Sequence, residues 1–279
     1  MEDSDGVFSP LKNLDIGSLS EIRCKRDESG RCGPSLLEVK KLTGGYSARQ
    51  PVIHDLSFTV SPGEMVGLIG LNGAGKSTTI KQILGFLRPK EGEIRFNGHR
   101  MDEDPAAFKK KLAYIPETPY LYPELTLREH LELTAMAYGI SPQEVEERTQ
   151  RLLELFQMKS KLDWYPGTFS KGMRQKVMVM AAFLVEPSLL IVDEPFIGLD
   201  PLAIHNLLEW MMELKKRGAG ILLSTHVLAT AEQNCDRFVL LREGRIALAG
   251  TMDEMRREAG MPGASLDELF IRAARGSRP

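Results

Sequence analysis

The stretch that decides the fold of this 279-residue chain is Gly70-Leu71-Asn72-Gly73-Ala74-Gly75-Lys76-Ser77. It fits the pattern G-x-x-x-x-G-K-[ST], in which glycines let backbone amides curl around phosphate oxygens without clashes from Cβ atoms. An apolar run from Met65 to Ile69 leads into this stretch, and Thr78 to Leu84 continues as a predicted helix. A glycine-rich match can arise by chance, but this strand–loop–helix context is the one that a phosphate-binding loop requires.

Two side chains of this loop are predicted to act directly on a bound nucleotide and its metal ion. Lys76 is expected to reach the β- and γ-phosphates, and the Ser77 hydroxyl to ligate Mg²⁺. The following helix places partial positive charge at its N-terminus, where the nucleotide is most negative. The predicted nucleotide-binding residues of the loop are Gly70, Leu71, Asn72, Gly73, Ala74, Gly75, Lys76, Ser77 and Thr78.

A pair of carboxylates ends a second apolar run. Leu189 to Val192 is typical of a buried strand, and Asp193 and Glu194 follow it directly. Ligands of open α/β sheets bind outside the carboxyl ends of the strands, which places this pair beside the phosphate loop. Asp193 is then predicted to hold Mg²⁺ through water, and Glu194 to orient or deprotonate an attacking water. Taken alone, the pair is explained equally well as a polar strand end ahead of Pro195.

The order of apolar patterns predicts an α/β fold with a largely parallel sheet. Short β-type runs alternate with stretches in which apolar residues recur every three or four positions. One such helix carries Ile204, Leu207, Leu208 and Met211 on one face, which indicates core packing. The predicted strands are Leu36–Leu42, Val52–Val60, Glu64–Gly70, Gly92–Asn97, Leu112–Ile115, Leu189–Val192, Ile221–Leu223 and Phe238–Leu241.

Composition divides the chain into three regions. Residues 1–35 form a polar N-terminal extension that is predicted to be weakly ordered. Residues 36–250 contain the predicted strands, and a helical block at 118–187 interrupts them like an insertion. Residues 251–279 form a short C-terminal tail with a helical stretch around Leu266 to Ile271.

Composition also limits which cellular compartment and which classes of partner are expected. The net charge of −2 gives no electrostatic reason to expect nucleic acid as a partner. Three scattered cysteines, Cys24, Cys32 and Cys235, indicate neither a disulfide framework nor a zinc site, so a reducing compartment is the simplest interpretation. The longest apolar run, Val177 to Val185, is far shorter than the ~20 residues that span a bilayer, and the acidic N-terminus lacks the apolar core of a signal peptide. Any work at a membrane is therefore expected to take place from its cytoplasmic side.

Further motifs make the chain resemble the ATP-binding subunits of ABC proteins over about Leu36 to Gly250. Ser170-Lys171-Gly172-Met173-Arg174-Gln175 is similar to the family's signature motif, and Gly198-Leu199-Asp200 to its D-loop. Ser224-Thr225-His226 resembles the segment with the switch histidine, and Tyr46 stands where the family has an aromatic that stacks on adenine. The residues from Tyr114 to Pro119 and from Phe169 to Lys176 resemble those of the ATPase of Ecs-type bacterial exporters.

The resemblance implies a RecA-like P-loop core with a β-subdomain and an inserted helical subdomain. It also implies ATP and Mg²⁺ as cofactors, and two nucleotide-binding domains that close head to tail around ATP. Ser170 and the amide of Gly172 would then contact the γ-phosphate bound by the partner subunit, since one chain cannot complete its own site. Asp200 would organise the interface between the two domains.

Two residues of the site are assigned from the resemblance and from their local setting together. His226 would bond the γ-phosphate and help to hold Glu194, because a γ-phosphate acceptor lies within reach of this strand end. Tyr46 is either the residue that stacks on adenine or an aromatic of a glycine-rich turn.

Three positions depart from the family pattern. Glu117 stands where most members have glutamine, at the loop that senses Mg²⁺ and the transmembrane partner. A carboxylate there can still bind the metal, but it adds negative charge near the acidic pair. Lys171 in the signature points either toward phosphate or toward solvent, and Ile197 precedes Gly198 where a small polar residue is common. None of these changes removes a group that positions metal, phosphate or water, so an active ATPase is expected.

The function implied by the resemblance is ATP-driven transport, with a separate multi-span permease as the membrane partner. A second, identical chain is the simplest partner subunit because one complete motif set is present. The alternative is an ABC ATPase that acts on ribosomes or DNA, but such proteins carry tandem ATP domains or long coiled coils, and this chain has one phosphate loop and no sustained heptads. The intact Glu194 and His226 argue against a non-hydrolysing regulator. Export is favoured over import by the Ecs-like segments and because only about 30 residues follow Gly250.

Overall fold

The computed structural model describes residues 35–47 and 49–275. The predicted N-terminal extension therefore lies outside the described residues apart from Ser35, and so do Cys24 and Cys32.

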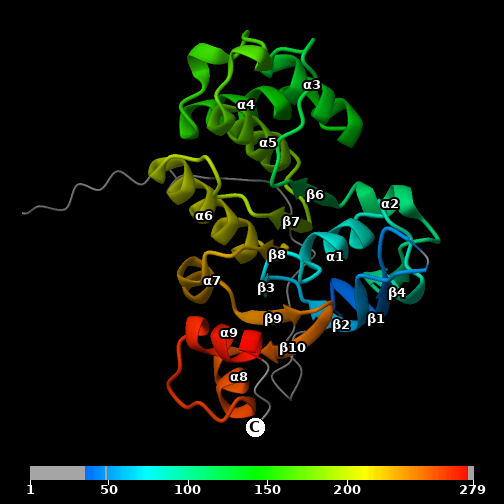
Figure 1. The fold of residues 1–279 in the computed structure, drawn as a ribbon. Coiled ribbons are helices and arrows are strands. Elements are labelled where there is room, and N and C mark those ends of the chain that lie inside the picture. Colours follow the sequence, from blue (N-terminus) through cyan, green and yellow to red (C-terminus); the bar gives the residue numbers. More distant parts are fainter. Residues whose placement is uncertain (1–34, 48, 276–279) are drawn as a thin grey trace, which may run out of the picture.

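The core is a six-stranded sheet in which the phosphate loop follows a central strand (Figure 1). Its strand order is β10-β9-β3-β8-β7-β6, and all neighbours are parallel except β9 and β10. Strands β3, β7 and β8 are buried along their whole length, because helices cover both faces of a parallel sheet, and each is an almost unbroken apolar run in the sequence. The strands are β3 (Met65–Gly70), β6 (Leu112–Ile115), β7 (Leu189–Asp193), β8 (Gly220–Ser224), β9 (Arg237–Arg242) and β10 (Arg245–Gly250).

A smaller antiparallel sheet, with strand order β2-β1-β4-β5, lies beside this core. Its inner face joins α1 (Lys76–Ile83) and one face of the large sheet in a single apolar cluster that includes Leu56, Leu68 and Ile80. The strands are β1 (Leu37–Gly44), β2 (Ile53–Val60), β4 (Glu91–Phe96) and β5 (His99–Arg100). The short β5 was not predicted from the sequence.

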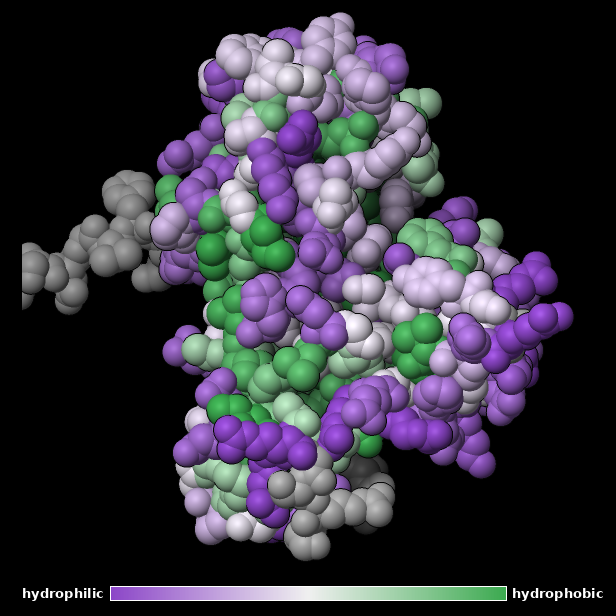
Figure 2. All heavy atoms as spheres, viewed as in Figure 1, coloured by the Kyte–Doolittle hydropathy of each residue, from purple (hydrophilic) through white to green (hydrophobic). Residues whose placement is uncertain are grey.

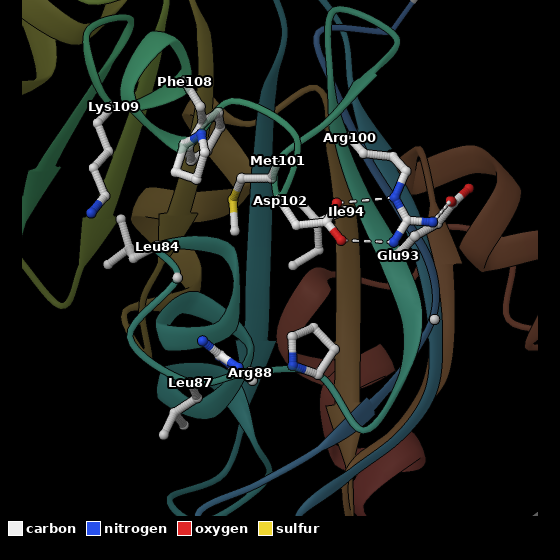
Figure 3. A pocket seen from close by; sticks show the side chains of 14 residues that line it. Leu84, Leu87, Arg88, Glu93, Ile94, Arg100, Met101, Asp102, Phe108 and Lys109 are labelled. Atoms are coloured by element: carbon white, nitrogen blue, oxygen red, sulfur yellow. Dashed lines mark hydrogen bonds and ion pairs between the residues drawn. The ribbon is translucent and has the colours of Figure 1, made fainter.

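A pocket of about 550 Å³ opens between the C-terminal end of α1, β4 and α2 (Pro105–Lys109) (Figure 3). Apolar side chains such as Met101 and Phe108 line one part of it. On another side Arg100 is held by Asp102 at 2.9 Å and by Glu93 at 3.3 Å. None of the predicted site residues lines this pocket.

A helical block lies between β6 and β7, at the top of Figure 1. Capping boxes begin its first two helices, with Thr126 paired to Glu129 and Ser141 paired to Glu144. The apolar faces of these helices are turned inward, since Leu127, Leu131, Leu152, Leu153 and Phe156 are all buried in one cluster. Its elements are α3 (Leu127–Tyr138), α4 (Pro142–Leu155), the 3-10 turns Lys159–Lys161 and Pro166–Thr168, and α5 (Lys171–Leu184).

The remaining helices pack against the large sheet. The predicted amphipathic helix is α6 (Pro201–Lys216), with Leu207 and Met211 fully buried. Helices α7 (Leu228–Asn234), α8 (Met252–Glu258) and α9 (Leu266–Arg275) share a small core with β9 and β10. Within the described ranges, no helix combines the length and the apolar character needed to cross a bilayer.

We predict that Phe183 is a main packing element between the helical block and α6. Its ring is fully buried, stacks on Trp210 with centroids 4.5 Å apart, and lies 6.2 Å from the ring of Phe156. Phe183→Ala should therefore lower the free energy of unfolding by about 3–5 kcal/mol, measured by urea denaturation. Leu133→Ala, which truncates an exposed side chain on α3, should change it by less than about 0.5 kcal/mol. Similar losses in both variants would contradict this packing role.

Candidate active site

The phosphate loop turns tightly from β3 into α1. Gly75, the residue before α1, has a φ of 108°, and a Cβ atom there would come within 2.6 Å of the Ile53 side chain. At Gly70 a Cβ atom would lie 2.7 Å from the carbonyl oxygen of Leu241. Both positions therefore require glycine, one for its left-handed backbone and both for close packing.

Lys76 is buried at the start of α1 and folds back over its own loop. Its Nζ donates to the carbonyl oxygen of Gly70 at 2.7 Å and to that of Leu71 at 3.4 Å. The same ammonium lies 3.9 Å from Oε1 of Glu194. The cation thus sits at the mouth of the loop, where bound phosphate oxygens would replace these carbonyl partners.

Asp193 ends β7 directly opposite Ser224 of β8. Its side chain is only 4% exposed, and Oδ1 has no hydrogen-bond partner among the described residues. Burial raises the pKa of Asp193, while the neighbouring hydroxyls of Ser224 and Ser77 act in the opposite direction and the negative charge of Glu117 adds to the increase. A buried, unpaired carboxylate oxygen beside a serine hydroxyl is a donor set that suits a hard cation such as Mg²⁺.

The described part of the chain contains no cluster of three or more His, Cys, Asp or Glu side chains that could hold a metal ion by itself. A cation held by Asp193 and Ser77 would therefore take its remaining ligands from phosphate oxygens and water. This agrees with the preference of Mg²⁺ for one or two carboxylates together with substrate phosphates.

Glu194 is held in an unusual backbone conformation beside the loop. Its φ is 47°, in the left-handed region, and its amide donates to the carbonyl oxygen of Ser224 at 2.9 Å. Its Oε2 accepts from the amide of His226 at 3.2 Å and lies 2.7 Å from Nδ1 of the same residue. Because a carboxylate only accepts, Nδ1 of His226 carries the hydrogen of this contact. These contacts fix the Glu194 carboxylate between His226 and Lys76 and hold a backbone that would otherwise be unfavourable.

One pocket of about 610 Å³ brings most of the predicted site residues together, and we call it the front pocket. Tyr46 borders it with its ring 63% exposed, and Lys81 both donates to the Tyr46 hydroxyl at 3.1 Å and lies 5.2 Å from its ring centre. Asp193 does not line the front pocket, but it lies next to Ser77, which does. The front pocket is lined by Tyr46, Val52, Gly70, Leu71, Asn72, Gly73, Gly75, Lys76, Ser77, Thr78, Glu117, Glu194, Ile197, His226, Leu228 and Phe270.

The sequence analysis singled out Ile197 only as a departure from the family pattern, and it missed three further lining residues, Val52, Leu228 and Phe270. All three are apolar and lie outside the motifs, so no local pattern distinguishes them from core residues. Ala74 of the predicted loop is buried and is not on the surface of the front pocket.

Ser170 and Gly172 lie apart from the front pocket, at the N-terminus of α5. The Ser170 hydroxyl caps this helix by accepting from the amide of Met173 at 3.2 Å. Gly172 packs directly on the carbonyl group of Gly198, so that any side chain there would collide with it. Lys171 is exposed, and the stem of its side chain lies over Gly198.

Asp200 also lies outside the front pocket, at the start of α6. Its side chain accepts from the amide of Ala203 at 2.8 Å and pairs with Lys176 of α5 at 2.7 Å. The hydrogen bond from Lys176 holds the pKa of Asp200 below its usual value. The signature-like and D-loop-like segments therefore contact each other, and Ser170, Gly172 and Asp200 do not line the front pocket.

The buried Asp193 carboxylate should make the ligand-free protein less stable at neutral pH. The pKa of Asp193 is higher in the folded chain than in the unfolded chain. As pH rises, this carboxyl group therefore ionises first in the unfolded chain, and the free energy of unfolding falls between the two pKa values. Asp193→Asn should therefore raise Tm by about 2–4 °C at pH 7.5 in the presence of a chelator, and this gain should shrink toward pH 4. Glu147→Gln, at an exposed site on α4, should leave Tm unchanged at both pH values. A lower Tm for Asp193→Asn at pH 7.5 would show that the buried carboxylate of Asp193 does not destabilise the folded chain.

The family model described as ABC transporter matches residues 53–197 of this chain. The ABC-type transporter ATP-binding protein EcsA of Bacillus subtilis is 57% identical over 237 residues, covering 85% of this chain and 96% of that protein. The Nod factor export ATP-binding protein I of Rhizobium etli is 38% identical over 219 residues, covering 78% and 69%. A solved structure described as the ATP-binding subunit of an ABC transporter is 59% identical, with a TM-score of 0.83 over 86% of this chain and 99% of that one.

These likenesses agree with the predicted RecA-like core, with the P-loop and with a fold that mixes two sheets and helices. The chain thus belongs to the ATP-binding, ATP-hydrolysing subunits of ABC transporters.

Proposed function

We propose that this chain works as a pair of identical copies that hydrolyse ATP with Mg²⁺ and drive an exporter. Its transmembrane part would be a separate multi-span permease, with the ATP-binding pair on the cytoplasmic face of the membrane. One observation carries the proposal. The front pocket gathers the phosphate loop, Glu194 and His226 of one chain, whereas Ser170 and Gly172 lie elsewhere.

Binding of ATP follows from the polar groups around the loop. Lys76 would exchange the carbonyl oxygens of Gly70 and Leu71 for β- and γ-phosphate oxygens. Tyr46 would stack on adenine with the ring face that Lys81 does not cover.

Ser77 and Asp193 would hold Mg²⁺, and Glu117 lies near enough to Asp193 to influence this site by its charge. When bound, Mg²⁺ supplies positive charge that neutralises the β- and γ-phosphates during transfer. The unpaired Oδ1 of Asp193 is the observation that supports this assignment.

Glu194 is the residue best placed to accept a proton from the attacking water. As the water oxygen bonds to the γ-phosphorus, the bond to the bridging oxygen of ADP breaks and the water proton passes to the carboxylate. His226 holds Oε2 of Glu194 through Nδ1, so Nε2 can donate to the γ-phosphate only when the ring carries both protons.

The paired arrangement follows from the residues that the front pocket lacks. Ser170 and Gly172 at the N-terminus of α5 form an anion-binding end that would meet the γ-phosphate held by the other copy. Asp200 would shape the same interface, since Lys176 ties it to α5. Leu71, Leu202 and Val227 are exposed apolar side chains. Figure 2 shows apolar surface over the region between α6 and α9. Such a surface suits burial against a second copy.

Transport by a separate membrane protein is supported by the relatives, which are named as ATP-binding proteins of transporters or of Nod factor export. Within residues 35–47 and 49–275 no helix could itself cross a bilayer. A permease partner would therefore supply the membrane path, and ATP-dependent closure of the pair would move it.

Two inactive variants should restore activity to each other if the site is built from two chains. Lys76→Ala and Ser170→Arg should each lower ATP hydrolysis about 10²-fold or more when pure. Mixed in equal amounts, they form pairs in which the intact loop of one chain meets the intact signature of the other, so about a quarter of the wild-type sites should return. Lys216→Ala, at an exposed lysine of α6, should hydrolyse ATP at the wild-type rate. A mixture that stays inactive although pairs form would argue against the shared site.

The membrane partner should be recovered with a variant that binds ATP but does not hydrolyse it. Tagged Glu194→Gln, isolated with ATP and Mg²⁺ from detergent-solubilised native membranes, should bring down a multi-span protein in fixed stoichiometry, measured by mass spectrometry. The same isolation with Lys76→Ala, which should not close on ATP, is the control for ATP dependence. Recovery of ribosomes or DNA in place of a membrane protein would overturn the transport proposal and leave the ATPase chemistry intact.

A further inference from the structure

We propose that Phe270, on the C-terminal helix α9, is a positioning residue for the phosphate loop and sets the affinity of the site for ATP. The proposal goes beyond transport, because it concerns nucleotide binding by the purified chain and does not depend on any membrane partner.

Two pockets meet at the tip of the phosphate loop. The front pocket lies on one side, and a second pocket of about 180 Å³, the rear pocket, lies between the loop, the end of β9 and the last turns of α9. The two pockets share four lining residues, Leu71, Asn72, Gly73 and Phe270. The loop tip is thus a thin partition, and Phe270 is the aromatic side chain that borders both of its sides.

The carbonyl oxygen of Leu71 accepts from the amide of Ala74 at 3.0 Å and from Nζ of Lys76 at 3.4 Å, but the tip has little other support. Leu71, Asn72 and Gly73 are exposed, with Leu71 at 57%, and a Cβ atom added to Gly73 would meet nothing within 4 Å. Within the described part of the chain, the amides of Asn72 and Gly73 have no hydrogen-bond acceptor. The loop is held at its base instead, where the amide of Gly244 donates to the carbonyl oxygen of Ala74 at 3.1 Å.

Helix α9 is anchored by buried side chains and hydrogen bonds, so it can support the loop tip. Leu266 and Leu269 are fully buried in the core shared with α7 and β9. The amide of Leu266 donates to Glu232 at 3.0 Å, and Arg242 donates to the carbonyl oxygen of Ala273 at 3.3 Å. Arg242 ends β9, two residues before Gly244, so the same turn anchors both α9 and the base of the loop.

Removal of the Phe270 ring would join the two pockets and leave the loop tip free to enter the rear pocket. Binding of a triphosphate would then have to order the tip, which weakens affinity. The groups that act on the γ-phosphate, Lys76 and Glu194, would keep their positions, because their contacts do not involve Phe270. The effect should therefore appear in the binding of ATP and not in the chemical step.

The test is steady-state ATP hydrolysis by the purified full chain. Phe270→Ala should raise KM for ATP about five- to tenfold and change kcat less than about twofold. Equilibrium titration with ATP, with Phe270→Ala added to Glu194→Gln to prevent turnover, should give the same loss of affinity. Phe270→Leu, which keeps most of the apolar volume, should recover most of the wild-type affinity. Ile271→Ala, next along α9 at an exposed site that borders neither pocket, is the matched control and should leave KM unchanged.

The proposal is overturned if Phe270→Ala lowers Tm but leaves ATP affinity within about twofold of wild type, because Phe270 would then be a packing residue only. A loss of affinity that Ile271→Ala reproduces would overturn it as well. Should Phe270→Ala not fold, Phe270→Gln, which keeps the side-chain length without the ring, is held to the same two criteria. Membrane co-purification plays no part in these measurements, so failure of the transport proposal and failure of this one are distinguishable.

Discussion

Parallel pairing of β3, β8 and β7 is the constraint on which the site depends. In this register Ser224 of β8 pairs with Leu68 of β3 on one side and with Asp193 of β7 on the other. The three strands therefore end at one edge, with the phosphate loop, the acidic pair and His226 all within the next few residues. A slip of one residue in β7 would turn Asp193 to the opposite face of the sheet and remove it from the loop. Burial of all three strands makes such a slip costly, because every apolar side chain would change face with it.

At the same edge of the sheet lie side chains and a backbone conformation that lower the stability of the fold. Oδ1 of Asp193 is buried and has no hydrogen-bond partner within residues 35–47 and 49–275, and Glu194 has a left-handed backbone. Lys76 donates to the backbone carbonyl oxygens of Gly70 and Leu71 in its own loop. Each of these groups is better satisfied by a metal ion, a water or a phosphate than by the protein. The site thus combines groups that fit a metal ion, a water and a phosphate better than they fit protein partners, and such locally unfavourable features are common at functional sites.

Sequence analysis located the residues that the front pocket brings together where these residues are adjacent in the chain. The phosphate loop follows the buried strand β3, and the two adjacent carboxylates lie at the end of the buried strand β7, so pattern and context were enough to place both. It did not predict β10, and it did not predict α7 and α8, which have seven residues each and are too short to show a helical period. Phe270 was missed for a different reason. Its role comes from the packing of α9 beside a loop far away in the chain, and a single aromatic in an amphipathic helix resembles any core residue.

The position of α5 ties the outer surface of the chain to the front pocket. Its N-terminus carries Ser170 and Gly172, while Gln175, one turn further on, is almost completely buried and donates to the carbonyl oxygen of Pro116 at 3.1 Å. Pro116 directly precedes Glu117, which lines the front pocket and acts on Asp193 through its charge. A displacement of α5 would therefore pull on the loop that faces the nucleotide. Because protein interiors are close-packed, this hydrogen bond is a short physical connection between the helical block and Glu117 of the front pocket.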